Sequence, residues 1–580
     1  MAPSDVLSGH HSMVDLLAEA AVGGGDRGFG FRGYDDQPER WMTFGTVDRR
    51  ARAIAVALAD LPPGSPVVLA YPAGPEFVTA FFGCLYAGMI AIPMASVLEG
   101  KATQSRARLH AVVADSGARR ILCTAADRTQ LLATGFAATL APGVRLTSTD
   151  DADESSADAW RRPDIRPETV THLQYSSGST GQPKAVSLTH RAVLEQLGML
   201  ARAVGVGPET GIASWLPHFH DFGLVGAVLL PVYARTSVWS MAPMSFVRRP
   251  VRWLETISQH RTEMIMSPNF GFDLCASRAT PESLAGLDLS GVRHALVGAE
   301  PVRADTLERF CATFGPAGFS RSALRPGYGL AEATLMVTLT SPGDLTVVDA
   351  DAEELLAGRL RPPDEDTGQT RRLVSSGLAP AGVDVVIVDP ATTQPVADGT
   401  VGEILVDSAA NGAGYWNQPE LTAEVFHVSV EQRPGRLYLR TGDLGVRSEG
   451  RLYVTGRIKD MIIFGGQNHY PHDIEVTVEG SHDGLRPGRS IAFSVDDGHA
   501  EQLVVVAEVA PGRWRNGDAE QRRRHLLDIE TAVRAAVAAE HGLRVHRILL
   551  LQSRRIPTTS SGKRQRRQCR DLYLAGGLTE

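Results

Sequence analysis

Helical and apolar segments alternate along the chain between residues 48 and 122. The apolar segments at residues 66–71 and 89–93 read PVVLAY and MIAIP, and they have the length and side-chain content of buried strands. The Ala-rich stretches between them have the pattern of helices. Strands that alternate with helices line up in parallel, with the helices on the faces of the sheet. This stretch therefore predicts an α/β fold with a doubly wound sheet.

A segment rich in hydroxyl groups and glycine follows an expected strand at residues 172–175; residues 173–184 read LQYSSGSTGQPK. Its glycines let backbone N–H groups approach an anion, its hydroxyls add donors, and its lysine adds a positive charge. The spacing differs from that of a P-loop, because the two glycines are too close together and no Ser or Thr follows the lysine. A flexible linker is the alternative. We interpret the segment as a phosphate-binding loop with the candidate residues Ser176, Ser177, Gly178, Ser179, Thr180, Gly181 and Lys184.

Composition argues against several classes of protein. The 580 residues are 43% hydrophobic and 21% charged, which is typical of a folded chain with several domains. A formal net charge of −8 does not supply the basic face of a nucleic-acid-binding protein, so we expect no nucleic-acid partner. The five cysteines are scattered without a C-x-x-C pair, which disfavours a zinc site and fits a cytoplasmic protein. The longest apolar run, residues 81–95, is shorter than the roughly 20 residues that span a bilayer, so we expect no integral membrane segment.

The end of the chain has its own pattern. Residues 518–540 carry apolar side chains at helical spacing, and this pattern stops at Gly542. The apolar run at residues 545–551 has the character of a strand. We therefore expect a separate, small α+β unit, and we divide the chain into domains of residues 1–455 and 456–580.

Eight motifs in order carry a family resemblance. The loop at residues 175–184 is followed by WLPHFHDFGL at 215–224, GAEPV at 298–302, YGLAEAT at 328–334, GYW at 414–416, YLRTGD at 438–443, GRIKD at 456–460 and PTTSSGK at 557–563. Together they resemble the adenylate-forming (acyl-activating, ANL) superfamily, whose members join a carboxylate to AMP and release pyrophosphate. The resemblance implies a large N-terminal domain of stacked mixed and parallel sheets with flanking helices, and a small C-terminal α+β domain on a hinge. It also implies the use of ATP and Mg²⁺.

The resemblance assigns roles to residues that would bind the nucleotide and the metal. Glu332, with Thr180, corresponds to the residues that hold Mg²⁺, although a carboxylate near a helix N-terminus is also stabilised without a metal. Asp443 corresponds to the aspartate that accepts hydrogen bonds from the ribose, and Arg457 to the arginine that contacts ribose or phosphate. An ordinary ion pair is the alternative for both. The other expected nucleotide-binding residues are Gly298, Ala299, Glu300, Tyr328, Gly329, Leu330 and Ala331.

Catalytic and hinge residues follow from the same resemblance. Lys563 corresponds to the lysine that contacts the substrate carboxylate and the α-phosphate during adenylation, where its charge stabilises the transition state. It also begins a basic run that extends to residue 570, for which a solvated or partner-facing tail is the alternative. His220 is expected to act beside the acyl and phosphate sites, since the H-x-H pattern with His218 lacks further metal ligands. Lys459 corresponds to the hinge, where rotation would move the catalytic lysine away and admit a thiol acceptor.

Further segments resemble one branch of the superfamily, the fatty acyl-AMP ligases, which pass the acyl group to an acyl carrier protein instead of coenzyme A. These segments read RPVRWL at 249–254, SPNFGFDLC at 267–275 and NHYP at 468–471. The stretch between Glu332 and Gly377 is also long, and residues 349–361 in it have a helical composition. In the resembled branch an insertion here disfavours the arrangement that accepts coenzyme A; a tolerated surface loop is the alternative.

The predicted function is therefore activation of a fatty acid, expected to be long-chain, to acyl-AMP, followed by transfer to the phosphopantetheine thiol of a carrier protein. The carrier is expected to belong to a polyketide or nonribosomal peptide synthase, and basic clusters at residues 522–524 and 564–570 would attract its acidic surface. A fatty acyl-CoA synthetase and an amino-acid adenylation enzyme, which Asp221 would suit, are the alternatives. An inactive relative that serves as a binding partner is a third, against which the intact charged motif residues argue. Phe270, Phe272 and Leu274 are expected to line an acyl tunnel or to belong to the core.

Overall fold

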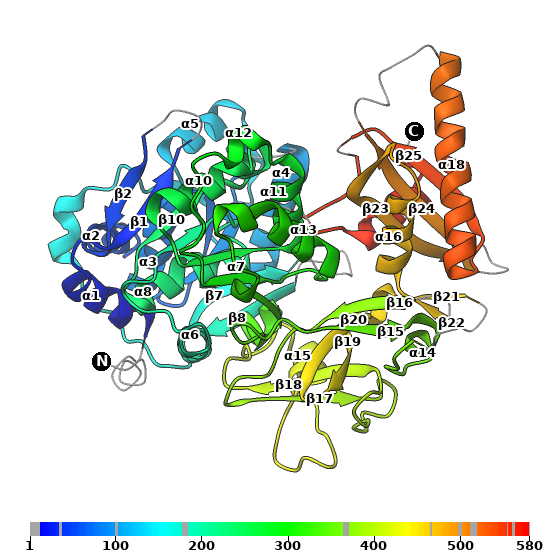
Figure 1. Cartoon of the computed structure of the whole chain (residues 1–580). Helices are drawn as coiled ribbons and strands as arrows, with labels where there is room; N and C mark the ends of the chain where they lie inside the picture. The colour runs from blue at the N-terminus through cyan, green and yellow to red at the C-terminus, as the bar shows by residue number, and fades with distance from the viewer. Residues whose placement is uncertain are drawn as a thin grey trace. The chain divides into compact units, whose positions relative to one another are not determined.

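The protein is represented by a computed structural model that describes residues 12–33, 38–98, 102–176, 184–363, 370–464, 467–496, 501–510, 519–553, 555–559 and 563–578 (Figure 1). The chain divides into two compact units. Unit 1 contains Met1–Thr346, Val374–Val386 and Leu405–Thr441, and unit 2 contains Val347–Leu373, Ile387–Ile404 and Gly442–Glu580. The boundary between domains at residues 455 and 456 stays a prediction.

A six-stranded sheet in unit 1 contains the strands expected from the alternating pattern. Its order is β6-β5-β3-β4-β7-β8, and all described neighbours are parallel except β7 and β8. The bounds are β3 (Pro66–Tyr71), β4 (Ile90–Ala95), β5 (Arg120–Cys123), β6 (Arg145–Ser148), β7 (Val170–Ser176) and β8 (Lys184–Thr189). Val68, Ile92 and Ile121 pack with Leu109 and Val112 in one core. Strands covered on both faces need continuous apolar sequences, which is the pattern that predicted β3 and β4.

A second sheet of unit 1 has eight strands in the order β14-β13-β12-β11-β9-β10-β1-β2. The central pairs are parallel, and the two outer pairs, β13 with β14 and β1 with β2, are antiparallel. The bounds are β1 (Gly28–Arg32), β2 (Arg40–Thr43), β9 (Ile212–Ser214), β10 (Val238–Met241), β11 (Met264–Ser267), β12 (His294–Val297), β13 (Leu324–Gly329) and β14 (Met336–Leu339). Helices pack on both sheets: α3 contacts β3 and β4, α10 contacts β9, and α11 contacts β11.

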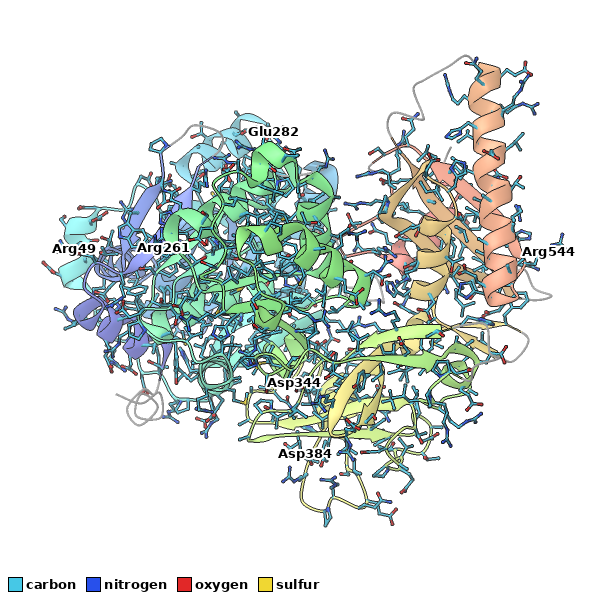
Figure 2. The ribbon with its side chains drawn as sticks, in the orientation of Figure 1. Arg49, Arg261, Glu282, Asp344, Asp384 and Arg544 are labelled. Carbon is cyan, nitrogen blue, oxygen red and sulfur yellow. The ribbon has the colours of Figure 1, made fainter. Side chains whose placement is uncertain are left out.

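The helices of unit 1 are α1 (Met13–Gly23), α2 (Phe44–Ala57), α3 (Pro75–Tyr86), α4 (Ala102–Ser116), α5 (Ala125–Ala133), α6 (His190–Val204), α7 (Asp221–Leu224), α8 (Leu230–Ala234), α9 (Pro243–Arg248), α10 (Val251–His260), α11 (Asn269–Arg278), α12 (Pro281–Leu284), α13 (Ala304–Phe314) and α15 (Pro419–Phe426). A four-stranded sheet has the order β17-β18-β19-β20, with β17 (Val383–Val388), β18 (Gly402–Ser408), β19 (Leu439–Ser448) and β20 (Arg451–Arg457). The start of β19 is tied to β17 by a hydrogen bond of 2.8 Å, which the hydroxyl of Tyr438 donates to Asp384, labelled in Figure 2. The largely parallel sheets, the helices that pack on them and the smaller terminal unit agree with the predicted α/β class.

Unit 2 ends in a three-stranded sheet of β23 (Leu485–Asp496), β24 (Glu501–Val509) and β25 (Val545–Leu551). One face packs against α16 (Pro471–Gly480) and α18 (Ala519–His541), with Val505 and Val533 in that core. The other face packs against α19 (Arg566–Leu574) through residues such as Phe493 and Cys569. The long helix α18 runs beside these strands in Figure 1. The predicted helix at 518–540, the predicted strand at 545–551 and the small α+β unit are confirmed.

The expected helical stretch at residues 349–361 is mostly not helical. Its beginning belongs to β15 (Val347–Asp351), which pairs with β16 (Thr370–Val374), and only α14 (Ala352–Leu356) is helical. Asp351 caps this short helix by accepting a hydrogen bond from the Glu354 N–H at 2.9 Å. Leu355 of α14 and Leu373 of β16 pack with Val446 and Tyr453 of β19 and β20. Packing against these strands therefore overrides the helical composition.

Two further findings bear on the expectations from composition. Among the described residues, no helix combines the length and the apolar character that crossing a membrane requires. All five cysteines are free thiols, and only Cys311 is not fully buried. The predicted hinge residue Lys459 lies in the turn η8 (Ile458–Asp460). A two-stranded sheet of β21 (Ile462–Phe464) and β22 (Gln467–His469) follows this turn.

Candidate active site

Four of the predicted motifs leave the eight-stranded sheet at one edge. Its neighbours β13, β12, β11 and β9 are parallel, so their carboxyl ends lie on the same side. The motifs at 215–224, 267–275, 298–302 and 328–334 each begin at or just after the end of one of these strands. Parallel α/β sheets bind ligands outside the carboxyl ends of their strands. The topology therefore brings together motifs that are far apart in the sequence.

Tyr415 connects two of the predicted site residues. Its hydroxyl donates a hydrogen bond to Glu332 Oε1 at 3.0 Å, and Lys184 Nζ lies 5.4 Å from the centre of its ring. An ammonium group near an aromatic face is attracted by the ring quadrupole. A carboxylate suited to a metal ion and an ammonium group suited to phosphate are thus held by one side chain. Tyr415 is not among the site residues predicted from the sequence, where its place in the GYW motif is the only signal.

The backbone around Glu332 is tightly constrained. Glu332 lies in the turn η7 (Ala331–Ala333) after β13, and its carbonyl accepts a hydrogen bond from the Gly412 N–H at 2.8 Å. Thr334 has a positive φ of 65° and donates from Oγ1 to Ala410 O at 2.5 Å. A β-branched residue in this region of φ is strained, so the surrounding contacts must hold it there. A Cβ at Gly329 would lie 1.7 Å from Leu335 O, which restricts that position to glycine.

The segment that carries Tyr415 lies along β8. The Ser187 N–H donates to Gly414 O at 2.8 Å, and the Trp416 N–H donates to Ala185 O at 2.8 Å. Gly414 has a φ of 128°, and a Cβ there would lie 2.2 Å from Thr422 Cγ2, so the turn requires glycine. Because β8 begins at Lys184, this pairing explains why Tyr415 lies near that lysine.

The phosphate-binding loop itself falls largely on residues that the structure does not describe. Ser177, Gly178, Ser179, Thr180 and Gly181 lie outside the described residues, and so does the side chain of Ser176. The two ends of the loop are placed: Ser176 on β7 is the register partner of Lys184 on β8. Next to this end, Gln174 Nε2 donates to Phe219 O at 3.0 Å, which ties β7 to the histidine motif. Gln174 was not among the predicted site residues.

The two histidines of the motif at 215–224 have different surroundings. His218 is 3% exposed, and burial lowers the pKa of its imidazole to about 4, so the ring is neutral at pH 7. His220 caps α7 and lies with Nδ1 2.5 Å from Asp221 Oδ1. The same Asp221 oxygen accepts the Phe222 N–H at 2.6 Å. Both contacts use Oδ1 of Asp221 and lie within its own turn, and a role of Asp221 in binding a substrate amine is not tested by them.

The loop after β12 supports a neighbouring helix. Ala299 has a φ of 66°, and Glu300 Oε1 accepts the N–H of Phe270 at 2.6 Å. This contact lies in the first turn of α11, whose N-cap residue Pro268 has no side-chain acceptor. A carboxylate at a helix N-terminus is favourable, so Glu300 stabilises α11 from outside the helix.

The aromatic residues considered for an acyl tunnel separate into two groups. Phe272 is fully buried and packs edge-on against Trp253 and Phe310, with ring centres 6.0 Å and 4.9 Å away. Phe272 therefore belongs to the core. Phe270 is partly exposed and meets Trp215 at 5.5 Å between ring centres, as a residue that lines a site could.

Asp443 and Arg457, in unit 2, form an ion pair. They are register partners on β19 and β20, and Arg457 Nε donates to Asp443 Oδ1 at 2.6 Å. The aspartate side chain is 7% exposed and the arginine side chain is 58% exposed. The ion pair given above as the alternative is thus present, and ribose binding by these residues stays a prediction.

Lys563, also in unit 2, lies on the second arm of a hairpin whose described arms are residues 557–559 and 563–565. Its N–H donates to Thr559 Oγ1 at 3.0 Å, and its carbonyl accepts the Thr559 N–H at 2.8 Å. The next residue, Arg564, pairs with Thr558 in an antiparallel bridge. These contacts fix the backbone of the lysine on both sides of the hairpin.

The alternative of a solvated basic tail after Lys563 does not hold for two of its arginines. Arg564 and Arg566 are only 15% and 20% exposed, because both bind the fully buried carboxylate of Glu475. Arg567 and Arg570 are exposed. The partner glutamate lies far away in the sequence, on α16, so local charge pattern could not reveal it.

The insertion between β14 and β17 is anchored within unit 2 by Arg371 of β16. Its Nη2 donates to Thr455 O at 2.9 Å, and its Nη1 lies 3.1 Å from Asp473 Oδ2. The guanidinium also lies 4.4 Å from the centre of the Tyr470 ring. Two of these three partners follow the predicted hinge in the sequence. The insertion is therefore more than a loose surface loop.

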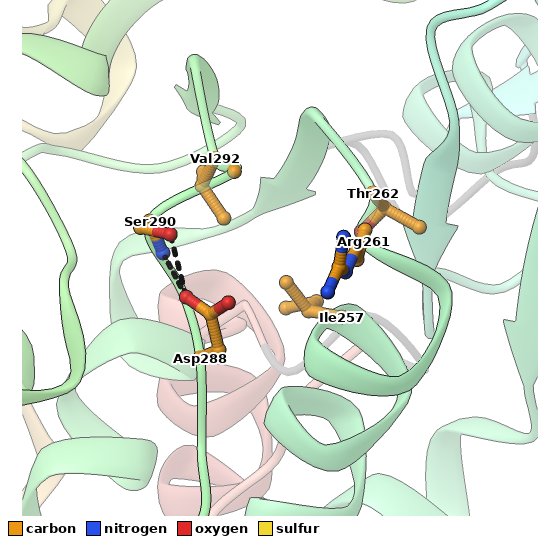
Figure 3. A pocket seen from close by; sticks show the side chains of 7 residues that line it. Ile257, Arg261, Thr262, Asp288, Ser290 and Val292 are labelled. Carbon is orange, nitrogen blue, oxygen red and sulfur yellow. Dashed lines mark hydrogen bonds between the residues drawn. The ribbon is translucent and has the colours of Figure 1, made fainter.

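A pocket of about 250 Å³ lies elsewhere in unit 1 (Figure 3). It is lined by Ile257, Arg261, Thr262, Asp288, Ser290, Gly291 and Val292. Asp288 there accepts hydrogen bonds from the backbone and the hydroxyl of Ser290, at 3.0 and 2.6 Å. The lining residues precede β11 and β12, so the pocket lies at the amino ends of these strands and contains no predicted site residue. The predicted motifs leave the sheet at the opposite, carboxyl edge, where parallel sheets bind ligands.

Comparison with known proteins gives matches along nearly the whole chain. Residues 21–416 match the family described as AMP-binding enzyme, and residues 459–580 match the Disco-interacting protein 2-like AMP domain. The chain is 40% identical to the medium-chain-fatty-acid acyl-carrier-protein ligase JamA of Moorena producens, over 93% of this chain and 91% of that protein. It is 36% identical to the long-chain-fatty-acid AMP ligase FadD32 of Mycolicibacterium smegmatis, over 94% of this chain and 90% of that protein.

Solved structures agree with these matches. A structure from a study of fatty acyl-adenylate ligases from E. coli and L. pneumophila has a TM-score of 0.87 at 32% identity and covers 98% of both chains. The fatty acyl-adenylate ligase from L. pneumophila in complex with acyl adenylate and pyrophosphate has a TM-score of 0.75 at 34% identity, over 98% of this chain and 97% of that chain. The structural matches and the sequence matches therefore cover the same part of the chain and lead to the same kind of protein.

Proposed function

Because the chain belongs to the AMP-binding enzyme family of adenylate-forming ligases, with fatty acid-AMP ligases among its relatives, we propose that it activates a fatty acid with ATP. In the first step a carboxylate oxygen of the fatty acid attacks the α-phosphorus of ATP, and pyrophosphate leaves. In the second step the phosphopantetheine thiol of an acyl carrier protein attacks the acyl carbon, loses its proton, and AMP leaves. The products are an acyl thioester, AMP and pyrophosphate.

The observation that carries this proposal is the arrangement of Lys184, Tyr415 and Glu332 beside the carboxyl edge of the sheet. Adenylation brings two anions together, so a site for it needs both a cation for phosphate and an oxygen ligand for a metal ion. The carboxylate of Glu332 keeps capacity for a cation, because a carboxylate has more acceptor positions than the one that the Tyr415 hydroxyl uses. Oxygen is the ligand that Mg²⁺ prefers, so Glu332 fits that ion, which would neutralise triphosphate charge.

The remaining roles rest on the family motifs. We assign the loop from Ser176 to Lys184 to the phosphates, residues 298–300 and 328–331 to the nucleotide, and Asp443 with Arg457 to the ribose. His220 is assigned to a place beside the acyl group, and Lys563 to the carboxylate and α-phosphate in the first step. Lys459 is assigned to the hinge. The cytoplasmic location inferred from the scattered cysteines stays a prediction.

The carrier protein as acceptor is supported by the relative from Moorena producens, whose name specifies an acyl-carrier-protein ligase. In our proposal, the carrier protein that accepts the acyl group from this chain belongs to a polyketide or nonribosomal peptide synthase. The anchored insertion supports rejection of coenzyme A, because Arg371 ties it to residues that follow the predicted hinge. Without such contacts, a fatty acyl-CoA synthetase would be the better assignment.

A product assay tests the proposal. The protein is incubated with ATP, Mg²⁺ and radiolabelled fatty acids from short to long chains, each with coenzyme A, with a phosphopantetheine-loaded carrier protein, or with neither acceptor. We expect acyl-AMP without acceptor, acyl-carrier with the carrier, and little acyl-CoA. Efficient acyl-CoA formation would instead identify a synthetase, and absence of acyl-AMP with every acid would contradict the proposal. Lys563→Ala serves as the control, because it should lose the first step while still transferring the acyl group from supplied acyl-AMP.

A further inference from the structure

The hairpin that carries Lys563 is attached to unit 2 on both arms by buried glutamates. Glu475 on α16 and Glu508 on β24 are both fully buried, which is rare for a charged side chain. Glu508 Oε1 accepts the N–H groups of Arg555 and Ile556, at 2.8 and 3.0 Å, just before the first arm. Glu475 binds the side chains of Arg564 on the second arm and of Arg566, the first residue of α19. The two ends of the hairpin thus depend on acceptors from separate elements.

The carboxylate of Glu475 is bound by both Arg564 and Arg566, and we call this set of contacts the clamp. Arg566 approaches with two nitrogens, Nε at 2.7 Å from Oε1 and Nη2 at 2.8 Å from Oε2. Arg564 Nη1 also binds Oε2, and its Nη2 lies 2.9 Å from Glu479 Oε1. The Ala492 N–H donates to Oε1 at 3.2 Å, which joins the carboxylate to β23. A bidentate arginine fixes direction as well as distance.

At neutral pH Glu475 is ionised and the neighbouring His472 is neutral. Burial alone would raise the pKa of Glu475, but Arg566 and Arg564 lower it to about 2. The neighbouring His472 has its pKa held well below the usual value by burial and by the two arginines, so it adds no competing charge. Arg566 also binds Asp460 at 3.0 Å, in the turn beside the predicted hinge residue.

The clamp restrains the backbone next to Lys563. Arg564 directly follows Lys563 and Arg566 begins α19, so their contacts with Glu475 fix the chain immediately after the lysine. A buried ionic cluster is not needed for stability, because well-packed apolar residues can replace one without loss. Its direct attachment to the segment of Lys563 therefore indicates a role in orientation.

We propose that Glu475, through Arg564 and Arg566, is a positioning residue that orients Lys563 for acyl-AMP formation, with Glu508 holding the other arm of the hairpin. The inference rests on the proposed function, because the lysine is needed only in the adenylation step. It predicts that the two half-reactions respond differently to loss of the clamp. A residue that only stabilises the fold would affect both.

The test compares the two half-reactions in Glu475→Gln, which keeps the shape of the side chain and an oxygen for the Ala492 N–H but removes the charge. Acyl-AMP formation is followed by ATP-pyrophosphate exchange. Transfer is followed with supplied acyl-AMP and free pantetheine as the thiol. We expect kcat of exchange to fall about 100-fold, since small misplacement of a catalytic group has effects of this size. The KM for ATP and the transfer rate should stay within about twofold of the wild type.

Two further variants separate positioning from folding. Arg566→Lys keeps the charge but not the two-nitrogen contact, so we expect an intermediate loss in exchange alone. Arg120→Met removes a buried guanidinium of unit 1, 8% exposed and 2.6 Å from Asp60, and should lower stability without separating the half-reactions. If Glu475→Gln proves unstable, Arg566→Lys and Glu508→Gln carry the same comparison.

The possible outcomes are distinct. A wild-type protein that forms acyl-AMP, with a selective loss of exchange in the variants, supports the inference. Equal losses in both half-reactions, or no loss in either, would overturn it while the proposed function stands. A wild-type protein that forms no acyl-AMP would overturn the proposed function and this inference with it.

Discussion

Tyr415 is the residue whose removal tests the geometry of the site most directly. Tyr415→Phe deletes the hydrogen bond to Glu332 but keeps the ring near Lys184. A hydrogen bond to a charged group contributes roughly 1.5–3 kcal/mol, so we expect kcat/KM for acyl-AMP formation to fall about 10- to 100-fold. Pyrophosphate release measures this loss.

A matched control for this variant exists in the same unit. Tyr438, which begins a motif but is not among the predicted site residues, is fully buried and donates the same type of bond to Asp384 at 2.8 Å. Tyr438→Phe should lower the melting temperature and leave kcat/KM nearly unchanged. Similar activity losses in both variants would show that the Tyr415 hydroxyl acts only through stability.

Buried histidines should make the stability of unit 1 sensitive to acid. Burial lowers the pKa of His172 to about 3 and of His190 to about 4. In the unfolded chain their pKa is about 6.5, so at lower pH the unfolded state binds more protons than the native state. Stability is therefore complete above pH 6.5 and is lost as the pH falls toward 4.

His172→Gln tests this pH dependence. Near pH 5 the variant should lose the contribution of one proton, which reduces the slope of unfolding free energy against pH by about 1.4 kcal/mol per pH unit. Denaturant titrations at several pH values measure the slope. Above pH 7, where the imidazole is neutral in both states, the difference between the two proteins should not vary with pH. Identical slopes at pH 5 would contradict the prediction.

At the scale of elements, the inserted strand pair β15 and β16 should control the choice of acceptor. If rotation occurs at Lys459, the contacts of Arg371 with Asp473 and Tyr470 must break. Arg371→Met removes the charge and should ease that rotation. We expect acyl-CoA formation to rise about 10-fold, which corresponds to a weakening of about 1.4 kcal/mol.

The adjacent residue supplies the control for this experiment. Arg372 lies 3.8 Å from Asp349 in a solvent-exposed pair, which contributes little. Arg372→Met should therefore leave the ratio of acyl-CoA to acyl-AMP unchanged. No increase with Arg371→Met would mean that this anchor does not determine rejection of coenzyme A.

Elements with a strong local pattern could be predicted from the sequence, and elements set by packing could not. β3, β25 and α18 follow apolar periodicity and agree with the structure within a residue or two. By contrast, the composition of residues 349–361 indicated a helix, but pairing of β15 with β16 and packing on β19 and β20 limit the helix to α14. Local propensity is weak when tertiary contacts compete with it.

The candidate site shows the same division. The sequence motifs predicted Lys184 and Glu332 as site residues but not Tyr415, because only the pairing of residues 413–416 with β8 brings Tyr415 near Lys184. The buried state of Arg564 and Arg566 depends on Glu475, which is 89 and 91 residues away in the sequence. Long-range partners of this kind leave no local pattern.

At the scale of the whole molecule, surface charge should govern the encounter with the carrier protein. Because Glu475 occupies Arg564 and Arg566, the basic surface near the end of the chain comes from exposed residues such as Arg523, Arg567 and Arg570. Arg524 pairs with Glu520 at 2.7 Å, but both side chains are largely exposed, so this pair competes only weakly with a partner.

Charge reversal tests this reduced basic surface. For Arg523→Glu combined with Arg570→Glu, we expect the KM for a phosphopantetheine-loaded, acidic carrier to rise about 10-fold at low salt, because complementary charge steers association. The difference should shrink at high salt, where surface charges are screened. Acyl-AMP formation and transfer to free pantetheine serve as internal controls and should not change, since neither involves the protein surface of the carrier. A KM for the carrier that is equal in both proteins at low salt would exclude these arginines from docking, and the carrier would then be recognised through its pantetheine arm or through uncharged contacts.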